Sequence, residues 1–428
     1  MQPNKGKVAY IMSRFPKITE TFILYEMMAM ERLGVPVEVY PFLREKTDVV
    51  HSEAEQYVER AHFGPFLLSR PILQAHLHYL RRQPRVYLDT LWTLLRANWG
   101  SARFFTRALA LFPKAVYFAR RMSDDGVTHV HAHFASHPAA AAFVVRRLAD
   151  IPYSFTAHGS DLHRDRHMLP EKVAEAEFVV PISRYNQQMI LDECGEQYRD
   201  KVVVVHCGVD TKVFKPRGAP TAHDRGEGPF TILCVGTLHE VKGQAYLIEA
   251  CRLLKGEGIT FICRFAGDGP DIEMLQRQAA EAGLAERVCF HGRLTREEVV
   301  ELLAQADVLV APSVPTSNGR REGIPVVLME AMGSSVPVIA SGISGIPELV
   351  EDGKCGFLVP PGDANRLAKA IEYLYHDPDL RRQFGRAGRQ KVINEFDLYK
   401  NAAILARYFD LENKTWQPSS SSSGVHWH

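Results

Sequence analysis

Short apolar runs alternate with longer amphipathic segments along most of this 428-residue chain. Residues 7–12 (KVAYIM) and 36–41 (PVEVYP) are predicted strands, and a helical run over 21–33 separates them. Further strands are predicted at 127–132, 153–157, 178–181 and 202–206, and further helices at 139–149 and 183–194. Apolar strands that alternate with helices predict an α/β fold with a doubly wound parallel sheet.

The pattern restarts after a polar stretch rich in glycine and proline at 215–229 (KPRGAPTAHDRGEGP), which is typical of an interdomain linker. Strands are then predicted at 230–235, 260–266, 288–291, 308–312 and 336–340, and helices at 244–255, 296–305 and 364–376. The sequence therefore predicts two Rossmann-like domains, 1–212 and 213–395. A last amphipathic helix, near 399–411 within 396–415, needs a partner surface. The serine-rich tail 416–428 is expected to be disordered.

Composition excludes several classes of protein. Apolar residues make up 46% and charged residues 24%, and the net charge of +1 offers no general attraction to nucleic acid. The seven cysteines are scattered without a CxxC pair, which argues against a disulfide framework or a structural zinc site. Without a signal peptide or an apolar run of about 18 residues, we expect a cytoplasmic protein.

Residues 60–121 form a strongly basic helical stretch with eleven Lys/Arg and one acid, Asp89. Aromatic and aliphatic residues are interleaved with the charges, as in FFTRALALFPKAVYFARRM. Such helices can lie on an anionic membrane, where each cation contributes about 1 kcal/mol. Three interpretations stay open: a solvated face of core helices, a surface for a membrane or a lipid-linked substrate, and an RNA-binding patch.

Loops that follow strands in the second half could bind a ligand, because parallel sheets bind ligands beyond the carboxyl ends of their strands. In VGTLHEVKG, Gly236 ends a strand and Lys242 precedes a helix, so the lysine could meet a phosphate. A solvated surface lysine is the alternative. The loop AGDGPD at 266–271 is a second glycine-rich turn after a strand.

The stretch EGIPVVLMEAM places Glu322 just before a predicted helix and Glu330 within it. Pro325 suits the first helical position, so free backbone N–H groups of Gly323 and Ile324 could bind an anion. A carboxylate accepts two hydroxyl protons, and one glutamate could bind a sugar and the other a ribose. The alternative is a capping glutamate followed by a solvated one.

The sequence EGIPVVLMEAMGSSVPVIAS resembles the E-x7-E signature of retaining family-4 glycosyltransferases, which have the two-Rossmann GT-B fold with a central crevice. VGTLHEVKG, FAGDGP and FHGRL resemble that family's other donor-site loops. In the first half, SRFPKITETFI, HVHAHFASHPA, IPYSFTAHGSDLH and VVHCGVDTKVF resemble bacterial exopolysaccharide transferases of the colanic-acid and amylovoran kind.

The resemblance implies a role for each matching position. Glu322 would contact the donor sugar, and His158 would lie at the reaction centre. The diphosphate would be bound by Lys242, Gly236, Thr237, Gly323 and Ile324, and the ribose and base by Glu330, Arg293 and Leu294. The acceptor side would include Glu20, Thr21, His133 and Asp161. The final helix would cross back onto the first domain.

The resemblance also implies the reaction. A sugar would move, with retained anomeric configuration, from a UDP- or GDP-linked donor to a glycan or lipid-linked oligosaccharide acceptor. No metal or other cofactor is expected, because Lys242 and the helix N-terminus would stabilise the leaving diphosphate. Family members usually carry arginine where this chain has Thr237. His239, Arg320 or Arg321 could replace that cation, whose contact contributes roughly 1.5–3 kcal/mol.

Two other functions compete with this interpretation. His129, His131 and His133 share one face of a predicted strand, and three imidazoles could bind the metal of a hydrolase. Carboxylate ligands for such a site are not evident in later strands. Thr237 leaves a second alternative, a nucleotide-sugar binding protein without catalysis.

Overall fold

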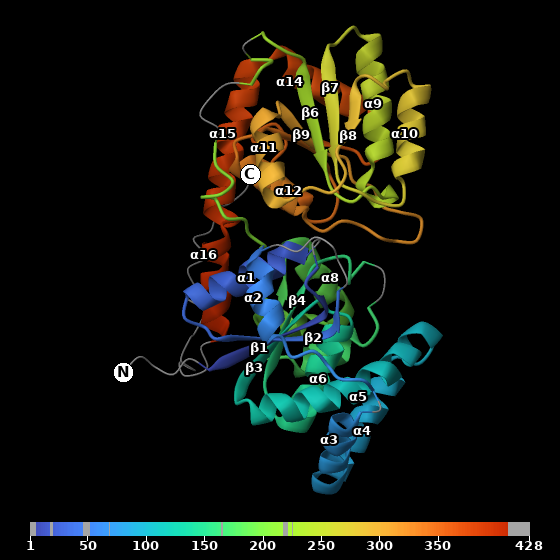
Figure 1. The fold of residues 1–428 in the computed structure, drawn as a ribbon, viewed down its shortest axis with the longest axis vertical. Helices are drawn as coiled ribbons and strands as arrows, with labels where there is room; N and C mark the ends of the chain where they lie inside the picture. The colour runs from blue at the N-terminus through green and yellow to red at the C-terminus, as the bar shows by residue number, and fades with distance from the viewer. Residues whose placement is uncertain are drawn as a thin grey trace.

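The computed structural model describes residues 6–17, 20–45, 52–67, 69–163, 166–216, 221–224 and 226–409. Two α/β domains are stacked along the long axis of the molecule, each built on a parallel sheet (Figure 1). No helix in these ranges is both long enough and apolar enough to span a bilayer. The predicted disorder of 416–428 concerns residues outside the described ranges.

The first domain contains, among the described residues, a five-stranded sheet in the order β2-β1-β3-β4-β5, with every pairing parallel. Its strands are β1 (Lys7–Phe15), β2 (Val37–Arg44), β3 (Val127–His133), β4 (Tyr153–Ala157) and β5 (Phe178–Pro181). Its helices are α1 (Thr21–Arg32), α2 (Ser52–Arg60), α3 (Arg70–Arg82), α4 (Pro84–Ala97), α5 (Ala102–Asp124), α6 (His137–Ala149), α7 (Leu169–Glu175) and α8 (Arg184–Cys194), followed by the 3-10 turn η2 (Glu196–Lys201).

The predicted strand at 202–206 is wrong. This segment runs beside β5 but forms a single isolated bridge, between Val202 and Val179. Val203 and Val205 donate their N–H groups to Val179 and Pro181, at 2.8 and 3.3 Å. The segment then leaves the sheet edge for the second domain, so a continuous apolar run becomes a connection instead of a sixth strand.

The second domain contains a sheet in the order β11-β10-β9-β6-β7-β8, again parallel throughout the described residues. Its strands are β6 (Phe230–Val235), β7 (Phe261–Ala266), β8 (Val288–Phe290), β9 (Val308–Ala311), β10 (Val338–Ser341) and β11 (Phe357–Val359). Its helices are η3 (Glu240–Lys242), α9 (Gln244–Gly256), α10 (Ile272–Glu281), α11 (Arg296–Gln305), α12 (Val326–Gly333), α13 (Ile346–Leu349), α14 (Ala364–His376) and α15 (Pro378–Glu395). Sequence patterning did not predict β11, α10 or α15.

The final helix, α16 (Leu398–Tyr408), returns to the first domain and lies along α1 (Figure 1). Asp397 caps it, because its carboxylate accepts the N–H groups of Tyr399 and Lys400, both at 3.1 Å. The same carboxylate accepts the Thr211 hydroxyl at 2.7 Å. The chain passes between the domains twice, near Thr211 and near Asp397, and this hydrogen bond joins the two passages.

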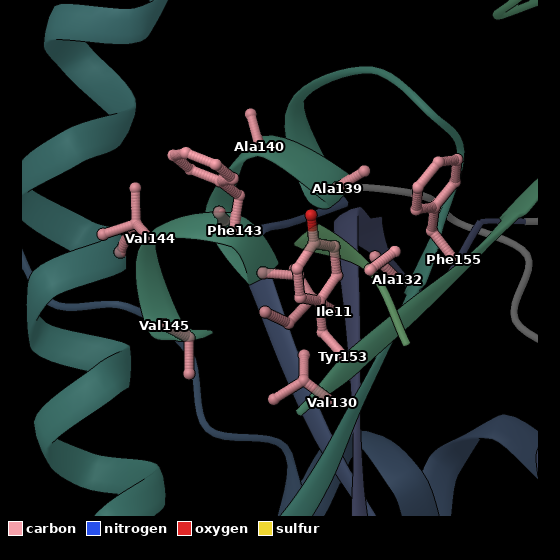
Figure 2. Packing of buried hydrophobic residues seen from close by; sticks show 14 of the residues in the cluster. Ile11, Val130, Ala132, Ala139, Ala140, Phe143, Val144, Val145, Tyr153 and Phe155 are labelled. Carbon is pink, nitrogen blue, oxygen red and sulfur yellow. The ribbon is translucent and has the colours of Figure 1, made fainter. Parts of the chain in front are cut away.

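Helix α6 packs closely on the first sheet because alanine side chains make up much of its buried face. Figure 2 shows Ala139 of α6 nearest to Ala132 of β3, with Ala140, Phe143 and Val144 farther along the helix. Tyr153 of β4 is fully buried there and donates its hydroxyl to the Lys172 carbonyl at 2.6 Å. Small alanine side chains at these positions let the helix lie close to the sheet.

Candidate active site

The loops at the carboxyl ends of β4 and β9 meet between the two domains. A Cβ atom at Gly323 would lie only 2.4 Å from the carbonyl oxygen of His158 and 3.2 Å from Ile182 Cδ1. Only glycine permits this approach of the two backbones. The contact places Glu322, which precedes Gly323, directly across from the His158 segment.

The start of α12 offers free backbone donors at this contact. The helix begins at Val326, and Pro325 is its cap residue, one position earlier than the first helical position that we expected. Within the described part of the chain, the N–H groups of Gly323 and Ile324 have no hydrogen-bond acceptor. Such donors at a helix N-terminus favour an anion.

Lys242 and Glu322, which were predicted to bind different parts of a ligand, contact each other. Lys242 Nζ lies 2.9 Å from Glu322 Oε2, and both side chains remain partly accessible. An accessible ion pair of this kind contributes little to stability. Each partner can therefore exchange the other for a group of a ligand at modest cost.

The position without the usual arginine has cations beside it. Thr237 is exposed and its carbonyl accepts Gln244 Nε2 at 3.0 Å. His239 Nδ1 accepts the Val241 N–H at 3.1 Å, and its Nε2 lies 3.4 Å from Arg320 Nη1. Arg321 instead reaches the hydroxyl of Tyr185 in the first domain, at 3.5 Å. Of the three candidates, Arg320 and His239 form a pair beside the loop.

The two glycine-rich loops of the second domain interlock. A Cβ atom at Gly267, whose φ is +145°, would lie 2.0 Å from the Gly236 carbonyl oxygen. Arg293 Nε lies 3.1 Å from Asp268 Oδ2 in the same loop, and Leu294 packs against the core. Arg293, one of the two residues predicted to flank the base, thus contacts the Gly267–Asp268 loop. That loop in turn packs against the loop from Gly236 to Lys242.

Glu330 lies one turn into α12, and its side chain is partly buried. Burial raises its pKa to about 7, and the guanidinium of Arg296 opposes that shift. Arg296 lies over the ring of Tyr25 at 4.1 Å, so it connects Glu330 to α1 of the first domain. Glu330 is not the solvated helical glutamate of the alternative interpretation.

His158 belongs to a buried relay. Its Nε2 lies 3.0 Å from His133 Nδ1, and His133 Nε2 lies 3.2 Å from Glu26 Oε1, which also accepts the Tyr10 hydroxyl at 3.0 Å. Burial lowers the pKa of His158 well below its usual value and that of His133 to about 3. Burial also raises the pKa of Glu26. The other ring nitrogen of His158, Nδ1, lies 3.9 Å from Cys207 Sγ.

The residues predicted for the acceptor side take different positions. His133 is fully buried and lies behind His158, so it does not reach the surface as we expected. Asp161 accepts the N–H groups of Ala135 and His158, at 2.5 and 3.0 Å, and thereby holds the loop. Glu20 and Thr21 begin α1, where Glu20 pairs with Lys17.

The other histidines of β3 act as core residues. His129 and His131 are fully buried, and Ser154 contacts both, at 2.7 and 2.8 Å. His131 also contacts the Thr156 hydroxyl, at 2.9 Å. One nitrogen each of His131 and His133 and one oxygen of Glu26 lie within 4.8 Å of one another. A hydrolytic metal needs a position open to substrate, and these fully buried rings provide none.

The sequence matches two descriptions of protein families. Residues 19–213 match Glycosyltransferase Family 4, and residues 219–391 match Glycosyl transferases group 1. The putative colanic acid biosynthesis glycosyltransferase WcaL of Salmonella typhimurium is 32% identical over 407 residues, which cover 91% of this chain and 96% of the relative. This chain belongs to the family-4 glycosyltransferases.

Other relatives agree with this assignment. The amylovoran biosynthesis glycosyltransferase AmsK of Erwinia amylovora is 36% identical over 248 residues, 56% of this chain and 59% of the relative. The structure of HepE from Anabaena in complex with UDP superposes with a TM-score of 0.69 and 19% identity, covering 94% of this chain and 98% of HepE. A glycosyltransferase of Rickettsia africae gives a TM-score of 0.70 at 18% identity, with 96% and 100% covered. The predicted GT-B fold is confirmed.

Three contributors to the glycosyltransferase site were missed in the sequence. Glu26 is an acid within the apolar run of α1, a signal that could have marked it as buried. Glu348 of α13 accepts the N–H groups of Arg184 and Tyr185, at 2.8 and 2.9 Å, across the domain boundary. Arg296 reaches Glu330 from another helix. The latter two depend on tertiary contacts that no local pattern reveals.

Glu330 gives the glycosyltransferase a specific dependence of stability on pH. Its pKa is about 7 in the folded protein, above the ordinary value of 4.5, so its contribution is complete below the unfolded pKa and is lost as pH rises through 7. A difference of one pKa unit between the folded and unfolded states changes the free energy of unfolding by about 1.4 kcal/mol. We expect the Tm of Glu330→Gln minus that of the wild type to become more positive between pH 5 and pH 8. A difference that stays constant over this range in thermal unfolding would contradict the desolvated, protonated state.

Proposed function

We propose that this glycosyltransferase moves a sugar from a UDP- or GDP-linked donor to a glycan acceptor, with retention of the anomeric configuration. The observation that carries the proposal is the cluster of Lys242, Glu322 and the free N–H groups of Gly323 and Ile324, placed against the His158 segment. This cluster offers one cation and two N–H donors for a diphosphate, and a carboxylate for sugar hydroxyls.

The reaction breaks the bond between the anomeric carbon and the diphosphate. Negative charge then grows on the leaving phosphate, where Lys242 and the start of α12 stabilise it. Arg320 with His239 supplies the positive charge that Thr237 lacks. The proposal needs no metal ion, because these groups meet the charge of the diphosphate.

Retention is proposed to follow from attack on the face that the diphosphate leaves. The leaving phosphate oxygen takes the proton of the acceptor hydroxyl, the C–O bond to the acceptor forms, and the bond to the diphosphate breaks. The neutral state of His158 supports this scheme, because a neutral ring adds no positive charge beside the developing oxocarbenium carbon. Glu330 is proposed to bind the ribose hydroxyls.

The names of the relatives place their reactions in exopolysaccharide synthesis, colanic acid for WcaL and amylovoran for AmsK. We infer the same class of product for this chain, with a lipid-linked acceptor. The first domain offers a surface suited to that acceptor. Apolar side chains with exposed fractions of 39–77% project from α3, α4 and the turn after them: Leu73, Leu77, Leu80, Val86, Leu88, Trp92 and Trp99.

Arginines border this exposed apolar surface, and α3 and α4 project from the body of the first domain (Figure 1). Arg81 and Arg82 end α3, and Arg85 begins α4. An apolar face with a basic border suits an anionic membrane, with tryptophan at the headgroup level. The arrangement favours a membrane over the solvated-face and RNA interpretations. Tryptophans alone could also stack on bases, but the five exposed aliphatic side chains that accompany them gain mainly by leaving water.

Removal of apolar anchors should release the protein from membranes. Trp92→Ser/Trp99→Ser should lower the fraction that floats with vesicles containing anionic lipid by about tenfold, since each indole loses burial in the interface. Tyr373→Ser removes an exposed aromatic ring of the second domain, 64% exposed, and is the matched control. Equal flotation of the tryptophan variant and the wild type would refute membrane docking through α3 and α4.

Nucleotide binding tests the donor site. UDP or GDP, without added metal, should raise the Tm of the wild type. At a nucleotide concentration a hundredfold above the Kd, binding should raise the free energy of unfolding by about 2.7 kcal/mol. Lys242→Ala should lose this increase in Tm, because the diphosphate loses its nearest cation. Lys255→Ala, at a surface site that donates to the Gly283 carbonyl, is the control. A chain whose Tm responds to no nucleotide would not have the proposed donor site.

Catalysis, as distinct from binding, is tested at His158. His158→Ala should lower turnover by about tenfold to a hundredfold while the Kd of the nucleotide changes less than threefold, because its ring lies at the reaction centre and not at the diphosphate. His62→Ala, whose ring contacts Glu38 far from the site, is the control. Parallel losses of turnover and nucleotide affinity would remove His158 from the reaction centre. Binding without any transfer or hydrolysis in the wild type would favour the binding-protein alternative.

A further inference from the structure

A basic hollow lies between the two domains, beside the site already described. Its volume is about 290 Å³, and it is lined by Arg103, Phe104, Arg107, Phe134, Ser136, His137, Ser160, Asp161 and Arg320. The first domain supplies eight of these residues, from the start of α5, the β3–α6 loop and the loop after β4. Arg320 comes from the second domain, two residues before Glu322. The hollow therefore opens next to the reaction centre but belongs mainly to the opposite domain from the donor loops.

The two arginines at the start of α5 have no counter-ion among the described residues. Arg103 and Arg107 are exposed, one helical turn apart, and within those residues neither guanidinium forms an ion pair or hydrogen bond. Their charges reach His137, since burial first and then Arg107 and Arg103 lower its pKa to about 4. With Arg320, three guanidinium groups line the same space.

Among the described residues, Asp161 is the one acid that lines the hollow, and a single carboxylate does not offset three guanidinium groups. Asp161 uses both carboxylate oxygens for backbone N–H groups of Ala135 and His158. Behind it lies the buried Lys172, whose charge interacts with Asp161 and whose ammonium group donates to the carbonyls of Ala135 and His167. Burial lowers the pKa of Lys172 to about 8. The net charge around the hollow is positive.

The hollow lies close to the exposed apolar surface of the first domain. Phe104 lines it, and the next residue, Phe105, contacts Trp99 edge to face at 5.5 Å between ring centroids. Trp99 is 77% exposed and is one of the membrane anchors proposed above. A single ligand could therefore place an anionic group among the arginines and an apolar chain along the tryptophan.

We propose that this hollow binds the phosphate or diphosphate ester of a lipid-linked acceptor, with Arg103 and Arg107 as its principal ligands. This inference rests on the proposed function, because it names the class of acceptor for the same site. Guanidinium groups bind phosphate through paired N–H donors, and arginine favours this geometry over lysine. The position beside His158 then brings the sugar attached to that phosphate to the reaction centre, while the lipid leaves toward Trp99 and α4.

The donor diphosphate has its own ligands in the second domain. Lys242 and the N–H groups of Gly323 and Ile324 lie together there, and none of them lines the hollow. Of the two side chains proposed to replace the cation at Thr237, Arg320 also lines the hollow, so it stands between the two anion sites. Arg103 and Arg107 come from the domain that carries the membrane surface. Two separate anion sites, one in each domain, fit a transferase whose donor and acceptor both carry phosphate.

Calorimetric titration of the full-length protein separates these sites, with three soluble probes: farnesyl diphosphate, inorganic diphosphate and farnesol. We expect farnesyl diphosphate to bind more tightly than either of the other two. Arg103→Gln/Arg107→Gln should raise its Kd at least tenfold and leave the Kd of UDP or GDP within twofold of the wild type. Arg120→Gln/Arg121→Gln removes the same charge from the far end of α5, where both arginines pair with aspartates, and is the control.

Each other outcome overturns the inference. Farnesyl diphosphate binding that is absent, or unchanged in the Arg103/Arg107 variant, removes the phosphate site. An equal loss of UDP or GDP affinity in that variant assigns these arginines to the donor instead. Inorganic diphosphate that binds as tightly as farnesyl diphosphate excludes the lipid-linked source. Failure of UDP and GDP to bind the wild type, by contrast, refutes the proposed function itself, whatever farnesyl diphosphate does.

Discussion

The contact between Gly323 and the carbonyl of His158 is the constraint on which the site depends. Two backbones from different domains approach so closely that a single methyl group would collide with the carbonyl oxygen, at 2.4 Å. Glu348 strengthens the junction, because its carboxylate caps the first amides of α8 from the other domain. These contacts bring the ends of four strands, two in each sheet, to one place. A small displacement between the domains would separate the donor loops from His158.

Burial sets the protonation of this site on both sides of the junction. In the first domain, it keeps His158 and His133 neutral beside Glu26, so the relay orients a ring without adding charge. In the second domain, it raises the pKa of Glu330 to about 7, so this carboxyl group sits near its ionisation point. Lys242 and Glu322 remain accessible and satisfy each other. The charged side chains proposed to contact a ligand, Lys242 and Glu322, thus remain partly accessible. The ionisable groups that orient the His158 ring are buried.

The first domain combines three surfaces that a transferase at a membrane would need. An apolar and basic face lies on α3 and α4, a cationic hollow lies at the start of α5, and His158, the proposed reaction centre, follows the end of β4. They follow one another in space, in the order in which a lipid, its phosphate and its sugar would extend. The second domain contributes Arg320 to the hollow, so closure of the two domains would assemble the acceptor and donor sites together.

The sequence by itself determined most of the strands, the two parallel sheets and the candidate donor loops. Apolar runs of strand length, such as 230–235, and helices with clear periodicity, such as 296–305, form as expected because local pattern and burial agree there. Short β11 and the polar α15 were not predicted, since neither has a strong periodic signal. Residues 202–206 have the pattern of a strand but form a connection.

Only the tertiary structure shows which partners the charged groups have. The pairing of Lys242 with Glu322, the contact of Arg296 with Tyr25 beside Glu330, and the burial of His133 behind His158 all join elements far apart in the chain. Spacing in sequence carries no information about such distances, because they are fixed by how the two domains pack.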